Sequence, residues 1–276
     1  DGRVVPLFVV DPALWLPSGP VRLEYLLASL RALDEDLSGG LLLRHGDPVD
    51  VLPEVVRASG AGSVHVAGDF APYGSARDAA VARALGEVPL VTIGSPYAVA
   101  PGRIRKPDAT AYRVFTPFYR AWLRHGWRSP IGPPGDVDWW SPLACEGYPA
   151  GPGIGRLRLP PAGERAAWAR WDSFRASALG RYPEHRDRAD LDGTSAMSQH
   201  LRFGEVHPRS LLAALFVLTL VMTKIKQRLS ANQEAAFIDQ LRHLPVAVNK
   251  VLELEPEIKA WAQRFADKHH ALFLGR

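Results

Sequence analysis

The stretch between residues 192 and 204 combines residue types that can bind a phosphate group. It reads Asp-Gly-Thr-Ser-Ala-Met-Ser-Gln-His-Leu-Arg-Phe-Gly, so the hydroxyls of Thr194, Ser195 and Ser198 follow a glycine and precede an apolar pair. Hydroxyls and backbone N–H groups at a turn before a helix suit a phosphate or pyrophosphate. The same residues also form an ordinary helix N-cap. Spacing alone favours the N-cap and leaves the anion-binding interpretation open.

Three other motifs with possible chemistry are weaker. The glycine-rich run 151–155 contains a proline and follows no strand, which argues against a phosphate loop. His269 and His270 are adjacent, so their side chains diverge, and no third metal ligand lies nearby. Cys145 has no local histidine to activate it as a nucleophile. We therefore expect no catalytic residue and no metal site at these positions.

The elements that must position these residues begin with an alternation of short apolar runs and helical patterns. The expected strands are 4–10, 41–43, 63–67 and 89–92, and the expected helices are 21–37, 48–58 and 75–85. Asp47 followed by Pro48 is a good start for the second of these helices. Strands separated by helical patterns of this length predict βαβ units and a parallel sheet. The fold class is therefore α/β up to about residue 128.

The rest of the chain is predicted to be a linker followed by helices. Residues 129–162 are rich in proline and glycine, which is typical of a long connection between domains. Beyond it, Trp168, Trp171, Phe174 and Leu179 share one helical face. Further helical patterns cover 215–229, 232–252 and 256–268, and a strand is expected at 271–274.

Composition changes sharply near residue 215. The first 215 residues hold 23 arginines and one lysine, whereas the last 61 hold four arginines and five lysines. Both asparagines also lie in this tail, with only two of the 24 prolines. Arginine and lysine serve similarly on a solvated surface, so structure alone does not require this change. It indicates two segments of different ancestry.

Several classes of protein are excluded by composition. An apolar fraction of 47% and a charged fraction of 22% describe a globular chain. One cysteine excludes a disulfide framework. The net charge of +4 is spread over both segments and forms no basic stripe for nucleic acid. The longest mostly apolar run, residues 211–222 with Thr219 inside it, is too short to span a bilayer, so we expect no membrane association and a cytoplasmic location.

The 192–204 stretch, with Tyr182 and Arg186-Asp187 before it, resembles the start of the flavin domain in the DNA photolyase/cryptochrome family. That family has a Tyr, then Arg-Asp, then Gly-Thr-Ser-x-Leu-Ser-x-x-Leu-x-x-Gly. Further blocks similar to the family occur in order at 5–12, 46–48, 72–78, 112–118 and 163–167. The resemblance covers about residues 1–214. It implies an α/β fold with a Rossmann-like parallel-sheet antenna domain, a linker and an all-helical C-terminal part.

The resemblance implies a domain plan and a set of cofactor contacts. The antenna domain would span 1–128, the linker 129–162, the beginning of the FAD-binding helical domain 163–214, and a helical segment 215–276. FAD would be bound by Tyr182, Thr194, Ser195, Met197 and Ser198. Asp69 would hold an antenna chromophore, a folate or a deazaflavin, and Arg186 would contact the DNA backbone.

The activity implied is light-driven repair of pyrimidine dimers in DNA, the carbon–carbon lyase reaction of deoxyribodipyrimidine photolyase. This chain departs from the family pattern with Ala196 in place of an arginine and Gln199 in place of a proline. It also lacks the family's opening strand and about 200 helical residues that complete the flavin pocket. We therefore expect the chain alone to bind flavin and DNA weakly and to be inactive.

The segment 216–276 resembles the isomerase part of glutamine–fructose-6-phosphate aminotransferase, in the region between its two sugar-isomerase domains. The similarity is carried by residues 243–245, 251–252 and 267–276. The catalytic residues of that enzyme lie outside this region, which argues against sugar-isomerase activity. The alternative to a photolyase function is a non-catalytic chimera. Under either interpretation, apolar surface at 211–222 and at Trp168 and Trp171 would favour self-association of the chain.

Overall fold

The computed structural model describes residues 3–132, 135–215 and 270–274. Within them a single parallel sheet has the strand order β2-β1-β5-β3-β4. The strands are β1 (Arg3–Val10), β2 (Leu42–His45), β3 (Val64–Val66), β4 (Leu90–Thr92) and β5 (His270–Leu274). The first four lie within two residues of the expected bounds, so the predicted parallel α/β architecture is confirmed at this level. The three predicted tail helices lie outside the described residues.

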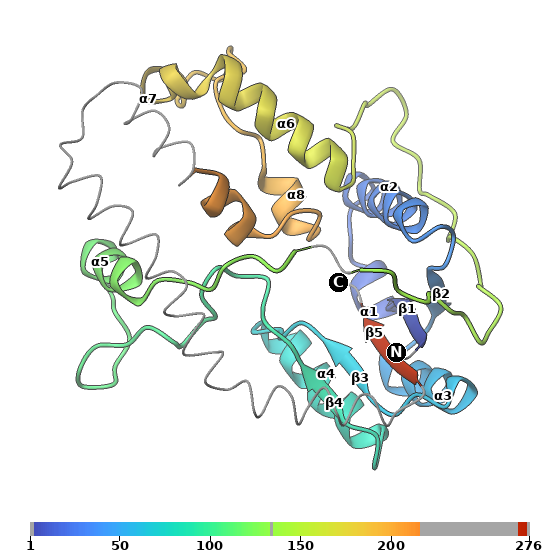
Figure 1. The fold of residues 1–276 in the computed structure, drawn as a ribbon. Helices are drawn as coiled ribbons and strands as arrows, with labels where there is room; N and C mark the ends of the chain where they lie inside the picture. The colour runs from blue at the N-terminus through green and yellow to red at the C-terminus, as the bar shows by residue number, and fades with distance from the viewer. Residues whose placement is uncertain (1–2, 133–134, 216–269, 275–276) are drawn as a thin grey trace.

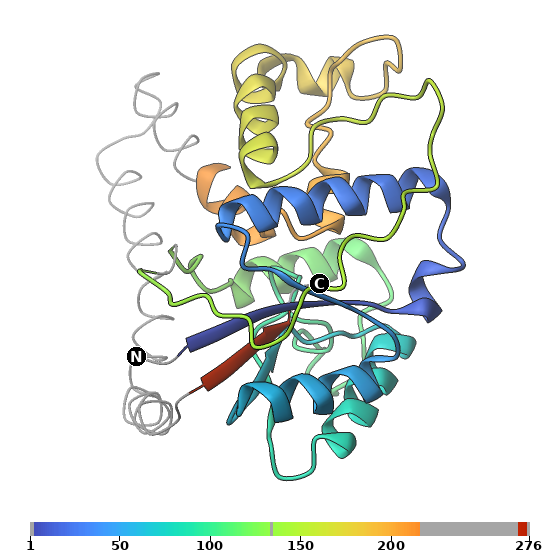
Figure 2. The ribbon, with the colours of Figure 1, turned by 90° about the vertical axis from the view of Figure 1, so that its right-hand side faces the viewer.

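Helices cover both faces of this sheet, as parallel strands require. α3 (Pro48–Ser59) and α4 (Pro72–Ala84) pack on one face, and α2 (Pro20–Asp36) packs on the other (Figure 2). The alternation along each strand explains this division: Leu7 and Leu42 belong to the core under α3, whereas Phe8 and Leu43 face α2. Asp47 caps α3 by accepting a hydrogen bond from the Val49 N–H, as expected from the sequence.

The strand β5 occupies the centre of the sheet, although it comes from the last residues of the chain. It runs parallel to β1, with Val5 opposite Leu272, and parallel to β3, with Val64 also opposite Leu272 (Figure 1). The sequence indicates a strand at this point, but local patterns give no information on its partners. β5 therefore joins the β1–β2 pair to the β3–β4 pair.

A second, helical layer lies on the far side of α2 from the sheet (Figure 2). It contains α6 (Glu164–Ser177), the 3₁₀ turn η1 (Leu179–Arg181), α7 (Tyr182–His185) and α8 (Ser198–Arg202). Its own core is formed mainly by apolar side chains of α6 and of the segment 197–211: Ala167, Trp171, Phe174, Ala178, Met197, Val206 and Leu211. The helical face predicted from the tryptophan spacing is thus the buried face.

This packing corrects the expected apolar surface at residues 211–215 and at Trp168 and Trp171, whereas residues 216–222 of that prediction lie outside the described residues. Trp171 and Leu211 are buried in the helical core, and Trp168 packs partly against it. An exposed apolar face occurs instead on α5 (Phe115–His125), where the Phe115 side chain is 73% exposed. Neither α5 nor the short α1 (Pro12–Trp15) is predicted from the sequence. Among the described residues, no helix is long and apolar enough to cross a membrane.

The linker residues run over the surface of both layers. The glycine-rich run 151–155 of the linker packs against α2, where the Gly153 N–H donates to Glu24 Oε1 at 2.8 Å. A Cβ atom at Gly151 would lie 2.4 Å from the same carboxylate. These glycines therefore permit a close approach to α2, which agrees with a connecting role rather than a phosphate loop.

Candidate functional site

A cavity of about 470 Å³ opens at the carboxyl ends of β1 and β3. Ligands of open parallel sheets bind at this edge. Its floor is formed by strand residues such as Val10 and Val66, and one wall by residues 201–204 of α8 and the turn after it. Aromatic side chains Trp15, Tyr73, Tyr97 and Phe203 also line it. The size and the aromatic lining suit a planar organic ligand.

The polar side of this cavity is organised around Asp11. Its Oδ1 accepts the Ala13 N–H at 2.9 Å and so caps α1, while its Oδ2 accepts the Tyr73 hydroxyl at 2.5 Å. Asp69, the predicted chromophore residue, also lines the cavity. Arg77 lies 3.9 Å from the Asp69 carboxylate, and its guanidinium group lies 5.9 Å from the centre of the Tyr73 ring. The cavity thus offers carboxylates and guanidinium groups, among them Asp11, Asp69 and Arg77, beside aromatic surfaces.

The Tyr73–Asp11 bond predicts a stability change at high pH. Burial, with the hydrogen bond to Asp11, raises the pKa of Tyr73 from 10.0 to about 12. A group whose pKa is raised in the folded state contributes stability that is present below its unfolded pKa and is lost as pH rises through the folded value. The wild type should therefore lose stability between about pH 10 and 12 relative to Tyr73→Phe. Melting temperatures of both proteins across this range test it; parallel curves would contradict it.

The hydroxyl-rich loop lies in the helical layer and is held by Arg170 of α6. The Arg170 guanidinium donates from Nη1 to Asp192 Oδ2 at 2.6 Å and from Nη2 to Asp192 Oδ1 at 2.5 Å. It also donates to the Thr194 carbonyl at 2.6 Å and the Ser195 carbonyl at 3.0 Å. The guanidinium lowers the pKa of Asp192, so this carboxylate stays ionised. One side chain therefore fixes both the start and the middle of the loop.

Close packing against α7 also shapes this loop. A Cβ atom at Gly193 would lie 2.6 Å from the Cβ of His185, so only glycine fits there. Ala196 has a φ of 48°, in the left-handed region that a non-glycine residue seldom adopts. The loop thus contains a close glycine contact at Gly193 and a strained residue, Ala196, two positions before Ser198.

The structure brings most of the predicted FAD residues into one neighbourhood. Thr194 and Ser198 are exposed, and Ser195 is half-buried. Met197 is buried in the helical core, so its backbone rather than its side chain is available to a ligand. Tyr182 begins α7, which packs on Gly193, and its ring meets Phe174 edge-on at 5.9 Å.

Of the other two predicted residues, Arg186 directly follows His185, which packs against Gly193 of the loop, whereas Asp69 lies in the other layer. Arg186 is exposed at the end of α7 and pairs with Asp187 at 3.4 Å. Asp69 belongs to the cavity at the sheet edge. None of these residue assignments is tested by the geometry alone, and each remains a prediction.

Sequence reasoning missed the residue that organises the loop. Arg170 stands 22 residues before its partner Asp192, and an arginine next to a core tryptophan carries no local signal for such a contact. A second missed feature is a buried polar cluster of Tyr25, His200 and Glu205, in which Tyr25 comes from the sheet layer. Among the described residues, no group of three potential metal ligands occurs.

Comparison with known proteins shows which proteins the first part of this chain resembles. Residues 1–135 match the family model described as DNA photolyase. A deoxyribodipyrimidine photo-lyase of Thermus thermophilus is 36% identical over 218 residues, which cover 75% of this chain and 47% of that protein. The chain thus spans about half the length of the photolyases that it matches. Over about three quarters of its length, the chain is therefore similar to DNA photolyases.

Solved structures show the same fold. A bacterial class III photolyase from Agrobacterium tumefaciens superposes with a TM-score of 0.62 at 24% identity, covering 87% of this chain and 51% of that one. An archaeal photolyase from Sulfolobus tokodaii, solved with two FAD molecules, has a TM-score of 0.56 at 19% identity, covering 76% and 48%. Together with the sequence matches, these structures confirm the predicted resemblance to the DNA photolyase/cryptochrome family.

A second part of the chain has a different relative. A 65-residue segment is 57% identical to glutamine–fructose-6-phosphate aminotransferase of Bordetella pertussis, covering 24% of this chain and 11% of that enzyme. This confirms the second predicted resemblance and agrees with the change in composition near residue 215.

Proposed function

We propose that this chain is the N-terminal part of a photolyase-type flavoprotein, in which the sheet-edge cavity binds the antenna chromophore and the 194–198 loop binds the phosphate end of FAD. The observation that carries the proposal is the pair of sites, one in each layer, with α8 between them. In such a protein the antenna chromophore absorbs light, and the flavin supplies an electron to a DNA lesion.

The donor set of the loop fits a pyrophosphate. Thr194 and Ser198 present exposed hydroxyls, which can donate to phosphate oxygens. Arg170 draws the carbonyls of Thr194 and Ser195 toward itself, so these acceptors do not compete for the ligand side of the loop. Tyr182 stands on the helix that the loop contacts. The described residues thus suit the phosphate portion of FAD.

The cavity fits an aromatic chromophore. Tyr73 and Phe203 offer ring surfaces from opposite layers, while Asp69 and Asp11 offer acceptors for ring N–H groups. Folate and deazaflavin chromophores both carry a planar heterocycle with such groups. We keep Asp69 as the residue that holds the chromophore and Arg186 as a contact to the DNA backbone.

We further propose that the chain by itself binds FAD and DNA weakly and does not repair lesions. It spans about half the length of the photolyases that it matches. The alternative, a non-catalytic chimera, is favoured by the aminotransferase-like segment and the abrupt change in composition.

Chromophore binding can be tested by filling the cavity. Ala71 lines it at the start of α4, so Ala71→Trp should prevent binding of a deazaflavin or a methenyl-folate. Ala82→Trp, an exposed position on the same helix outside the cavity lining, is the matched control. We expect saturable quenching of chromophore fluorescence by the wild type and the control only. Equal binding by Ala71→Trp, or no binding by the wild type, would contradict the assignment.

A further inference from the structure

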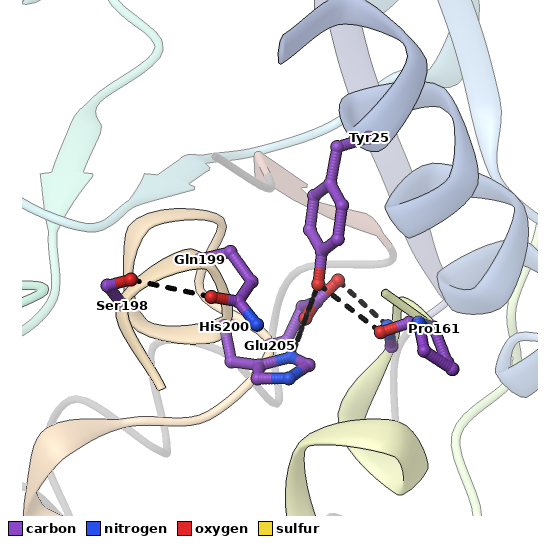
Figure 3. Close-up of polar contacts among 7 residues, drawn as sticks. Tyr25, Pro161, Ser198, Gln199, His200 and Glu205 are labelled. Carbon is purple, nitrogen blue, oxygen red and sulfur yellow. Dashed lines mark hydrogen bonds and ion pairs between the residues drawn. The ribbon is translucent and has the colours of Figure 1, made fainter. Parts of the chain in front are cut away.

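Three polar side chains are buried together where the sheet layer meets the helical layer. Tyr25 comes from α2, His200 from α8, and Glu205 from the turn after α8 (Figure 3). Their side chains are almost sealed from solvent: Tyr25 is 4% exposed, His200 1%, and the Glu205 side chain 3%. Burying such groups is unfavourable unless they satisfy one another. We name Tyr25, His200 and Glu205 the polar cluster.

Glu205 joins the members of the polar cluster. Its Oε2 accepts from the Tyr25 hydroxyl at 3.0 Å and lies 2.5 Å from His200 Nδ1. Its Oε1 accepts the Gly163 N–H at 2.8 Å, at the start of α6. Figure 3 shows Tyr25, His200 and Glu205 side by side, with dashed lines between their polar atoms. Glu205 therefore ties together α2, α6 and α8.

Tyr25 acts in this arrangement as a fixed hydrogen-bond donor. Burial, together with the charge of Glu205 and its hydrogen bond, raises the pKa of Tyr25 above its ordinary value. The hydroxyl thus keeps its proton and can donate to the carboxylate. Its oxygen also lies 3.3 Å from His200 Nδ1, and its ring packs on Phe203 at 5.0 Å between ring centres. The contact is polar at the hydroxyl and apolar along the ring.

The position of α8 matters for both candidate sites. Its first residue, Ser198, belongs to the hydroxyl-rich loop, and residues 201–204 form a wall of the sheet-edge cavity. His200 lies in the chain between Ser198 and the cavity-lining residues 201–204, and its side chain points into the polar cluster. A shift of α8 would therefore change the loop and the cavity together.

We propose that the polar cluster positions α8 and thereby sets the geometry of both ligand sites. Tyr25, His200 and Glu205 are positioning residues and touch neither ligand. The part of the inference that concerns ligand affinity rests on the proposed function, whereas the part that concerns the placement of α8 does not.

The test uses Tyr25→Phe and Glu205→Gln in the full chain, with Tyr148→Phe as the matched control. Tyr148 is half-buried and, like Tyr25, donates to a carboxylate, Asp34 Oδ2 at 3.1 Å, but neither Tyr148 nor Asp34 belongs to α8 or to the turn after it. Hydrogen exchange measured by mass spectrometry should be about tenfold faster for the amides of 198–206 in Tyr25→Phe, because a buried carboxylate loses one donor. The amides of β1 and α3 should be unchanged.

Ligand affinity separates a positioning role from a role in stability alone. If the polar cluster only stabilised the fold, a folded variant would bind both ligands as the wild type does. Tyr25→Phe should weaken both FAD and chromophore binding, again by about tenfold, while Tyr148→Phe weakens neither. The double variant Tyr25→Phe/Glu205→Gln should be no weaker than Glu205→Gln alone, because both changes disrupt one cluster.

Two outcomes would overturn the inference. Exchange at 198–206 that is unchanged in Tyr25→Phe would show that the polar cluster does not position α8. Faster exchange with unaltered affinity for both ligands would show that α8 moves without affecting the sites. If the wild type binds neither ligand, the proposed function fails, and the exchange result still decides whether the polar cluster holds α8.

Discussion

Replacing Leu272 by proline should remove most of the stability of the sheet layer. β5 is an interior strand, paired with β1 on one side and with β3 on the other. Proline cannot donate to the ladder, and its ring is not accommodated between two neighbouring strands. We expect a loss of about 3 kcal/mol or more, a large share of the stability of a typical domain.

Leu272→Ile is the matched control, because it keeps the backbone N–H and has a high strand propensity. A chain that ends at residue 269 lacks β5 altogether. It should be less stable to urea than the proline variant and should unfold without a cooperative transition. Urea unfolding followed by circular dichroism measures all three proteins. If the chain ending at 269 unfolds with the same midpoint and slope as the full chain, β5 is not part of the sheet in solution.

Removing the Arg170 guanidinium should disrupt the hydroxyl-rich loop. In Arg170→Met, the Asp192 carboxylate and the carbonyls of Thr194 and Ser195 lose their common donor. Hydrogen bonds that involve charged groups contribute about 1.5–3 kcal/mol each, but Asp192 is largely solvated and will recover part of this from water. We expect a modest loss of overall stability and a loss of FAD affinity of at least about tenfold.

The control for this experiment is Arg175→Met on the same helix. Arg175 forms an exposed ion pair with Asp172 at 3.0 Å, so its removal should change stability little. Equilibrium titration with FAD, followed by flavin fluorescence, gives the affinity of both variants. An Arg170→Met protein that binds FAD as the wild type does would show that the loop needs no support from α6.

Much of the sheet layer can be predicted from sequence because its signals are local. The run 4–10 is apolar on both faces, and Asp47 followed by Pro48 marks a helix start, so β1 and α3 lie close to the expected bounds. β5 is different. A strand signal at 271–274 is visible, but pairing across more than 260 residues of chain depends on the whole sheet.

The candidate sites divide in the same way. Thr194 and Ser198 can be proposed as FAD contacts because the 192–204 stretch resembles the family pattern, although their spacing alone favours a helix N-cap. Arg170 and the Tyr25–Glu205 contact cannot be predicted in this way, because each depends on how separate helices pack. The tryptophan spacing of α6 correctly predicts which face of the helix is buried. It does not predict that the segment 197–211 covers Trp171.

The central claim is that the 194–198 loop binds the phosphate end of FAD, and the most direct measurement is the visible absorbance and fluorescence of the purified chain before and after FAD is added. We predict little flavin after purification, then saturable binding on titration that ADP competes away and that Ser198→Ala weakens. A flavin signal that stays identical to that of free FAD throughout the titration would contradict the claim. The relation to photolyases would then describe the ancestry of the chain and not a function that it retains.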